Sequence, residues 1–315
     1  MTSIRSFFLK RYLHSAQKAI LRRKYHEDLQ KIRKGFEMLA NKHPLPKHVY
    51  FKRIYIQDIP AAWIIPAKAN KEIVMLYLHG GGYAAGSVNT HKALISKIAK
   101  KTGVVALAID YRLAPEHPFP AAIDDAICAY DYLLEQNYLP QNIFIMGDSA
   151  GGGLTIATLI ALKEMGRPMP ATAVCLSPWT DLAVTGASVK EKAHLDPLIV
   201  GYLLSEWAAR YAGETPTDHP LISPLYANLS GLPPMLIQVG TDEVFLDDST
   251  RFAQKAREQG TDVTLDVWDG MIHVWQYLWY VIPEANEAIK QIATYVNAKI
   301  NQATIESSVT HPISQ

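Results

Sequence analysis

The sequence contains few cysteines and almost no net charge. Cys128 and Cys175 are the only two cysteines among 315 residues, which is too few for a disulfide framework or a zinc site. We expect them to be buried, reduced thiols, as in a cytoplasmic protein. The formal net charge is +1, so the composition does not indicate a nucleic-acid-binding protein.

Long apolar runs are also missing. No run approaches the length of about 20 residues that a helix needs to cross a bilayer. The first residues contain only the short run Phe7-Phe8-Leu9 between charges, so we predict no secretory signal peptide and a cytoplasmic location.

Residues 1–40 have helical periodicity and are basic before the first acid, Glu27. Such a segment could be an amphipathic helix on a membrane surface. Alternatively, it could pack its apolar face over a pocket and leave its charges in water. We favour packing, and therefore expect no membrane contact.

From residue 49 onward, strand and helix patterns alternate along the chain. Strands are predicted at 50–59, 61–65, 73–78, 104–109, 143–146, 171–176, 235–239 and 263–268. Helices are predicted at 91–101, 121–136, 150–163, 248–259 and 284–300. The first two strands are predicted to pair antiparallel. The alternation of strands and helices after them predicts an α/β fold with a doubly wound, mostly parallel sheet.

The alternation is interrupted after Trp179 by a partly helical stretch. We interpret residues of about 182–221 as a cap inserted over the active-site edge, together with an N-terminal helical cap segment at 1–48. The catalytic domain then covers 49–300, and the polar residues 301–315 are expected to form a flexible tail.

A Gly-x-Ser-x-Gly sequence centred on Ser149 joins the strand at 143–146 to the helix that follows. This strand–turn–helix context is typical of a nucleophile elbow, in which a tight turn raises the serine hydroxyl above the sheet. Gly147 and Gly151 would leave room for the neighbouring backbone. The pentapeptide also occurs by chance in simple turns, so catalysis requires a base, an acid and an oxyanion site.

Among eleven histidines, His273 follows the last predicted strand, where functional loops of an open α/β sheet gather. It is our predicted general base for the Ser149 hydroxyl. Asp242 follows the strand at 235–239, and we predict that it orients the imidazole. Asp247 and Asp248 are assigned instead to capping the next helix.

The sequence His79-Gly80-Gly81-Gly82 directly follows a buried strand. Its backbone N–H groups can point into the site unobstructed, so we assign Gly81, Gly82 and Ala150 to an oxyanion hole. A phosphate-binding loop is excluded because neither Gly-x-Gly-x-x-Gly nor a Gly-Lys-Ser/Thr ending is present.

Other charged and aromatic residues are candidates for a loop brace and for a substrate pocket. Arg112 and Glu116 are expected to pair and brace their loop, with Asp148 as a further partner. Four aromatic residues could line a substrate pocket, namely Tyr83, Tyr202, Trp207 and Trp275. Core packing explains these residues equally well. No grouping of histidine, cysteine and carboxylate has metal-ligand spacing, so no metal or cofactor is predicted.

Three motifs together resemble the hormone-sensitive-lipase-like esterases, which include bacterial carboxylesterases. They are His79-Gly-Gly-Gly-Tyr83, the segment Asp110-Tyr-Arg-Leu-Ala-Pro-Glu-His-Pro-Phe-Pro120, and Gly147-Asp-Ser-Ala-Gly-Gly152. The family is also resembled by two shorter segments, Ser-Pro-Trp-Thr-Asp-Leu at 177–182 and Gly-Thr-Asp-Glu at 240–243. The chain departs from the family at Met271-Ile272, because the family often has a proline or an aromatic residue before the histidine. The resemblance covers roughly residues 50–300 and implies an α/β-hydrolase fold with a cap and a Ser149–His273–Asp242 triad.

The resemblance also implies hydrolysis of short- to medium-chain carboxylic esters through an acyl-enzyme on Ser149. A lactonase with the same triad is the alternative, because a cyclic ester needs the same chemistry. A ligand-binding relative is less favoured, since such receptors have lost the histidine. The expected partner is a small ester or lactone, and the family suggests a possible homodimer.

Overall fold

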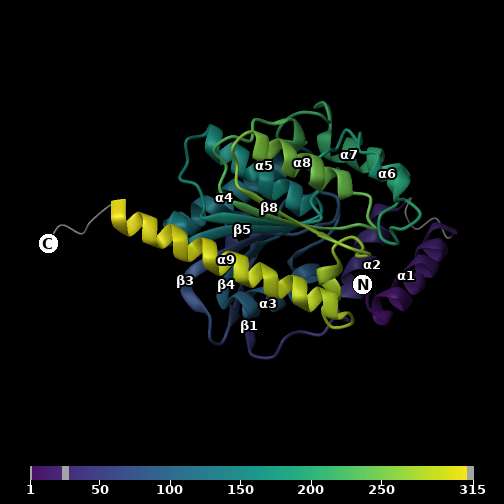
Figure 1. Ribbon diagram of the computed structural model, residues 1–315, viewed down its shortest axis with the longest axis horizontal. Coiled ribbons are helices and arrows are strands. Elements are labelled where there is room, and N and C mark those ends of the chain that lie inside the picture. The colour runs from purple at the N-terminus through teal and green to yellow at the C-terminus, as the bar shows by residue number, and fades with distance from the viewer. Residues whose placement is uncertain (1, 23–27, 311–315) are drawn as a thin grey trace.

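The computed structural model describes residues 2–22 and 28–310, and an eight-stranded sheet lies at the centre of this part of the chain (Figure 1). The spatial order is β1-β2-β4-β3-β5-β6-β7-β8. The strands are β1 (Val49–Ile56), β2 (Ile59–Pro66), β3 (Asn70–Leu78), β4 (Val104–Ile109), β5 (Ile143–Asp148), β6 (Thr172–Leu176), β7 (Met235–Gly240) and β8 (Val263–Trp268).

Burial explains the strand sequences. The central strands β4, β5, β6 and β7 are buried along their whole length, and strands covered on both faces consist of almost continuous apolar residues. β1 and β2 pair antiparallel with each other, and β2 pairs antiparallel with β4. All remaining pairs are parallel, which confirms the predicted α/β architecture.

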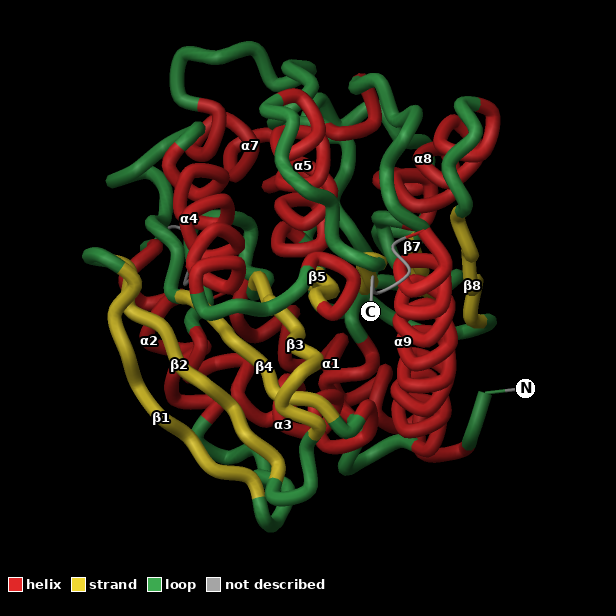
Figure 2. Tube along the Cα trace, turned by 90° about the vertical axis from the view of Figure 1, so that its left-hand side faces the viewer, coloured by secondary structure: helices red, strands yellow, loops and turns green. Residues whose placement is uncertain are grey.

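Helices cover both faces of the sheet (Figure 2). One face packs against α4 (Ala121–Glu135), α5 (Ala150–Glu164) and α8 (Leu246–Glu258). The other packs against α3 (Val88–Thr102) and α9 (Pro283–Thr310). The helix α9 continues to Thr310, so the predicted helix end at residue 300 is too early. Residues 311–315 lie outside the described part of the chain.

The N-terminal helix α1 (Ile4–Arg22) packs one face against the region that follows β8. Leu9 and Leu13 contact the apolar cluster that contains Met271 and Ile272, which agrees with the packing interpretation. The outward face differs from the prediction, because it exposes the aromatic side chains of Phe7, Phe8 and Tyr12 as well as charges. No helix in the described residues is long and apolar enough to cross a membrane.

The second helix, α2 (Leu29–Ala40), is fastened to the loops that follow β3 and β4. The Arg33 guanidinium donates hydrogen bonds to the backbone carbonyls of Ala84 (2.8 Å) and Ala114 (2.9 Å). Glu37 accepts a hydrogen bond from the Ser87 hydroxyl, which caps α3. This helix therefore braces the segment that contains the glycine loop.

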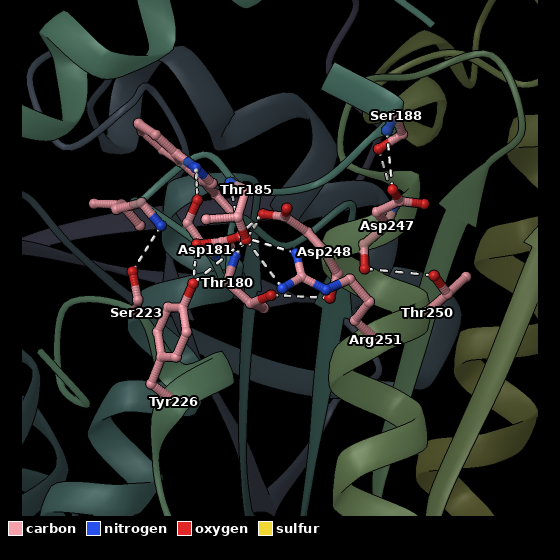
Figure 3. Close-up of polar contacts among 12 residues, drawn as sticks. Thr180, Asp181, Thr185, Ser188, Ser223, Tyr226, Asp247, Asp248, Thr250 and Arg251 are labelled. Carbon is pink, nitrogen blue, oxygen red and sulfur yellow. Dashed lines mark hydrogen bonds and ion pairs between the residues drawn. The ribbon is translucent and has the colours of Figure 1, made fainter. Parts of the chain in front are cut away.

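The insertion between β6 and β7 contains α6 (Ser188–Glu191), the 3-10 turn η3 (Gly201–Leu203) and α7 (Leu204–Ala212), at the position predicted for a cap. Figure 3 shows how its base is attached to α8. The Asp248 carboxylate accepts hydrogen bonds from the N–H groups of Thr180 (3.0 Å) and Asp181 (3.2 Å). The Arg251 guanidinium pairs with Asp181 at 3.0 Å.

Asp247 and Asp248 consequently do not cap α8, as the sequence had suggested. Asp247 accepts a hydrogen bond from the Ser188 N–H at 2.9 Å, and Asp248 holds the insertion as described above. Burial, followed by the negative charge of Asp181, raises the pKa of Asp248 well above its usual range. Both side chains face the insertion because the first turn of α8 lies directly beneath it (Figure 3).

Candidate active site

Ser149 lies in a sharp turn between β5 and α5, as the elbow motif predicted. Its φ and ψ are 54° and −123°, a strained conformation for a residue with a side chain. The glycines on either side are required by close backbone contacts. A Cβ at Gly147 would lie 2.2 Å from the Gly151 carbonyl oxygen, and one at Gly151 would lie 2.1 Å from that of Leu78.

The carboxylate that contacts His273 belongs to Glu243 rather than Asp242. Glu243 Oε2 lies 2.9 Å from His273 Nδ1. Asp242 instead forms an ion pair with Lys10 of α1, with Oδ2 2.7 Å from Nζ. The prediction that Asp242 orients the imidazole is therefore wrong: the two adjacent side chains point in different directions, and the longer one faces inward.

Glu243 is fully buried, and its second oxygen is also occupied. Glu243 Oε1 accepts hydrogen bonds from the Gly240 N–H (2.6 Å) and from the Ser177 hydroxyl (2.9 Å). Ser177 in turn accepts a hydrogen bond from the Val274 N–H at 3.1 Å. A buried carboxylate needs such partners to remain charged. Ser177 belongs to the 177–182 motif, but the sequence alone indicated no role for it.

The protonation of His273 is governed by opposing effects. Burial disfavours the charged imidazole, but the hydrogen bond and negative charge of Glu243 outweigh it and raise the pKa of His273 above its usual value. Asp196 of the insertion and Asp148 of the elbow act in the same direction. Burial raises the pKa of Asp196 itself to about 6. The environment is therefore arranged to stabilise an imidazolium ion.

The structure places Ser149 and His273 at the same edge of the sheet without a hydrogen bond between these two described residues. The Ser149 N–H donates a hydrogen bond to the Leu176 carbonyl at 2.8 Å. The next residue, Ser177, accepts a hydrogen bond from the N–H of Val274, which directly follows His273. Exposed fractions are 7% for Ser149 and 5% for His273. Catalytic hydrogen bonds often tighten only when substrate binds.

The glycine loop after β3 has a backbone conformation that favours glycine. Gly81 and Gly82 adopt φ values of 122° and 62°, which residues with side chains rarely adopt. The Gly80 N–H donates to Asp148, so it is already occupied and is not a proposed oxyanion donor. Ala150 is the first residue of α5, where backbone N–H groups are free of intrahelical partners. Gly81, Gly82 and Ala150 therefore remain the proposed donors.

Asp148, directly before the serine, supports this loop from below. It is buried and accepts hydrogen bonds from the Tyr77 hydroxyl (2.8 Å) and the Gly80 N–H (3.2 Å). It also lies 3.3 Å from His91 Nε2. Burial disfavours the charged His91 ring, but the Asp148 carboxylate outweighs it and raises the pKa of His91. The sequence had not indicated this role for His91.

The expected brace between Arg112 and Glu116 is not formed, and neither residue contacts Asp148. Arg112 pairs with Asp125 of α4 at 2.7 Å. Glu116 pairs with Arg33 of α2 at 2.7 Å, and this hydrogen bond holds the pKa of Glu116 at about 2. Both residues are structural, as predicted, but each is joined to a helix that is remote in sequence.

The four aromatic residues predicted to contact substrate lie in different environments. Tyr83 stacks on Tyr211 with ring centroids 3.7 Å apart and is 1% exposed, and Trp275 is fully buried against Trp268. Both belong to packed cores, in agreement with the alternative interpretation of these two residues as core residues.

Trp207 and Tyr202 remain candidates for substrate contact. Trp207 of α7 lies against the glycine loop, since a Cβ at Gly82 would be 2.3 Å from its ring. Tyr202 is an exposed residue of η3. The described residues contain no group of three or more histidine, cysteine or acidic side chains that could hold a metal ion.

Comparison with known proteins gives consistent matches. Residues 75–277 match a family model described as "alpha/beta hydrolase fold". An "Acetyl-hydrolase" of Streptomyces hygroscopicus is 45% identical over 75% of this chain and 79% of its own length. An "Esterase" of Acinetobacter venetianus is 37% identical over 74% and 78%, respectively. A crystal structure of an esterase from the bacterial hormone-sensitive lipase family superposes with a TM-score of 0.90 at 40% identity, covering 95% of this chain and 100% of the other.

Proposed function

The chain belongs to the hormone-sensitive-lipase-like esterases of the α/β-hydrolase fold and is a carboxylic ester hydrolase, and from that premise we propose that it hydrolyses short- to medium-chain esters through an acyl-enzyme on Ser149. The observation that carries this mechanism is the buried contact between Glu243 and His273 at the edge of the sheet where the elbow presents the serine.

In the first step, His273 takes the proton of the Ser149 hydroxyl as the oxygen attacks the ester carbonyl carbon. Glu243 accepts the Nδ1–H of His273 and so leaves Nε2 free to act as the base. The negative charge of Glu243 also stabilises the imidazolium that forms. This assignment rests on the 2.9 Å contact and on the raised pKa of His273.

The attacked carbonyl oxygen becomes an oxyanion, for which the N–H groups of Gly81, Gly82 and Ala150 are the proposed donors. Each donor held in place before the reaction is worth roughly 3–4 kcal/mol of transition-state stabilisation. His273 then protonates the leaving alcohol, and the acyl group stays on Ser149. A water molecule activated by the same histidine releases the acid and restores the serine.

The restricted space around the serine supports small acyl groups. Ser149 is 7% exposed, and the Trp207 ring lies directly on Gly82 of the proposed oxyanion loop. Trp207 would thus limit the length of chain that can extend past the loop. We expect acetyl and butyryl esters to be better substrates than long-chain esters. Lactones remain the alternative substrate class, and the described residues contain no feature that favours them.

The experiment is steady-state hydrolysis of p-nitrophenyl butyrate at neutral pH by the wild type and by Ser149→Ala. We expect turnover in the wild type, a burst of p-nitrophenol, and an acyl adduct on Ser149 detectable by mass spectrometry. Turnover that persists in Ser149→Ala would remove the elbow serine from the mechanism. If the wild type hydrolyses only lactones, the proposed substrate class is wrong.

The assembly and location are also proposals. β8 is an edge strand of the sheet, and Val267 on it is exposed, so we propose a homodimer in which this edge contributes to the interface. Cys175 is buried, Cys128 is half-buried, and both are free thiols, which is compatible with the reducing cytoplasm. Light scattering of the purified protein and cell fractionation test these two points.

A further inference from the structure

The N-terminal helix α1 touches both loops that present the proposed acid and base. Lys10 Nζ lies 2.7 Å from the Asp242 carboxylate and donates a hydrogen bond to the Gly270 carbonyl at 3.1 Å. Asp242 precedes Glu243 directly, and Gly270 lies three residues before His273. A single ammonium group thus links two segments that come together only in the folded chain.

The same two loops also contact each other closely. The Asp242 N–H donates to the Met271 carbonyl at 3.0 Å, and the Gly270 N–H donates to the Thr241 hydroxyl at 2.8 Å. A Cβ at Gly240 would lie 2.1 Å from the Met271 carbonyl oxygen. Any shift of one loop is therefore transmitted to the other, and with it to the Glu243–His273 contact.

Other contacts fix α1 in this position at both ends. The Ser3 N–H donates to Glu284 at the start of α9 at 2.6 Å. Leu9 and Leu13 pack against the cluster that contains Met271 and Ile272. The Gln17 amide donates to the Asp196 carbonyl at 3.3 Å, and the Asp196 carboxylate accepts the Val244 N–H at 3.1 Å.

We propose that Lys10 is a positioning residue for catalysis: it holds the loop of Glu243 against the loop of His273, so that α1 sets the geometry of the acid–base pair. This inference rests on the function proposed above. Lys10 contacts neither Glu243 nor His273 and acts only through Asp242 and Gly270. Its side chain is 21% exposed and that of Asp242 is 18% exposed, so both are largely shielded from competing water.

The test compares the wild type with Lys10→Met, Asp242→Asn and the double variant. We expect kcat to fall by about tenfold to a hundredfold in Lys10→Met, because small displacements of reacting groups have effects of this size. KM should change less than kcat, because Lys10 does not touch substrate. The kcat of the double variant should be no lower than that of the less active single variant, since the two residues act as one unit.

Three controls separate positioning from folding. Lys18→Met removes an exposed lysine of the same helix and should leave kcat unchanged. Lys10→Arg keeps the charge and should recover most of the activity. In Lys10→Met, the acid limb of the pH profile of kcat/KM should move to lower pH, because a looser Glu243 contact no longer raises the pKa of His273. If Lys10 only stabilises the fold, the melting temperature should fall without this shift in the pH profile.

The outcomes are decisive for the role of Lys10. A kcat within twofold of the wild type in Lys10→Met, or a fall that Lys18→Met reproduces, would overturn the proposal. Independent, multiplicative effects of Lys10→Met and Asp242→Asn would do the same. Failure of the proposed function has a different signature: Ser149→Ala would remain active, or the wild type would hydrolyse only lactones, whatever happens at Lys10.

Discussion

The elbow that contains the proposed nucleophile, Ser149, is one short stretch of sequence, whereas the proposed base side takes its residues from three separate loops. Asp148, Ser149 and Ala150 are consecutive, and the elbow that contains them is fixed by the buried strand β5 and the helix α5. Ser177, Glu243 and His273 follow β6, β7 and β8, and hydrogen bonds between their side chains join them. The first arrangement is determined by local backbone geometry, and the second depends on tertiary packing.

Replacing Glu243 should have the largest effect on the base side. We expect Glu243→Gln to lower kcat by about 10³–10⁴-fold, because an amide no longer fixes the tautomer of His273 or stabilises its charged form. Loss of the carboxylate should also lower the pKa of His273, so the acid limb of the pH–rate profile should move to lower pH. Hydrolysis of p-nitrophenyl butyrate between pH 5 and 9 measures both effects. Equal activity in Glu243→Gln and the wild type would contradict the assignment.

In the glycine loop beside the elbow, Gly81→Ala should damage the proposed oxyanion hole. The new Cβ would lie 2.2 Å from the Ala85 carbonyl oxygen at a φ of 122°, so the backbone must move. We expect kcat to fall by about 10²–10³-fold, the cost of losing one oxyanion donor. Gly103→Ala is the matched control, since Gly103 also has a positive φ but no neighbour within 4 Å of a new Cβ. Similar kcat losses in both variants would argue against the oxyanion role.

Ser177→Ala should have a smaller effect on the base side. It removes one hydrogen bond to Glu243 and one acceptor for the Val274 N–H but leaves the Glu243–His273 contact. We predict a decrease in kcat of about tenfold, in line with the 1–2 kcal/mol typical of a single buried hydrogen bond. Steady-state kinetics together with circular dichroism melting separates this from unfolding. A fall as large as that of Glu243→Gln would mean that Ser177 has a direct catalytic role.

His91→Gln, beneath the glycine loop, should affect stability more than rate. Because Asp148 raises the folded-state pKa of His91, the stabilisation is fully present below the unfolded value of about 6.5 and is lost as the pH rises through the folded value. The deficit in unfolding free energy relative to the wild type should therefore be about 1–2 kcal/mol near pH 5.5 and smaller at pH 9. Urea unfolding at both pH values measures it, with His117→Gln on an exposed loop as the control. A deficit that grows with pH would contradict the charge pair.

The elements of the fold were predictable because their signals are local. Continuous apolar runs identified the buried strands. The elbow motif and the glycine loop located Ser149 and the proposed oxyanion donors on two loops that lie against each other in the structure. The boundaries of α9 were less clear, since its last turns are polar and composition alone resembled a tail.

The choice between Asp242 and Glu243 could not be made from the sequence. Both follow β7 in the same turn, both are carboxylates, and only the direction of each side chain separates them. That direction is set by the Gly240 N–H, Ser177 and His273 around Glu243 and by Lys10 beside Asp242. Likewise, Tyr83 and Trp275 could be recognised as core residues only once their neighbours were known.

The sequence by itself therefore determined the α/β fold and located the proposed nucleophile, the proposed base and the glycine loop, because each depends on residues adjacent along the chain or on the order of buried strands. Only the tertiary structure decided which carboxylate contacts His273, the partners of Asp148 and the attachment of α1 to the proposed base side. These depend on contacts between residues far apart in sequence, for which a single sequence contains no local signal.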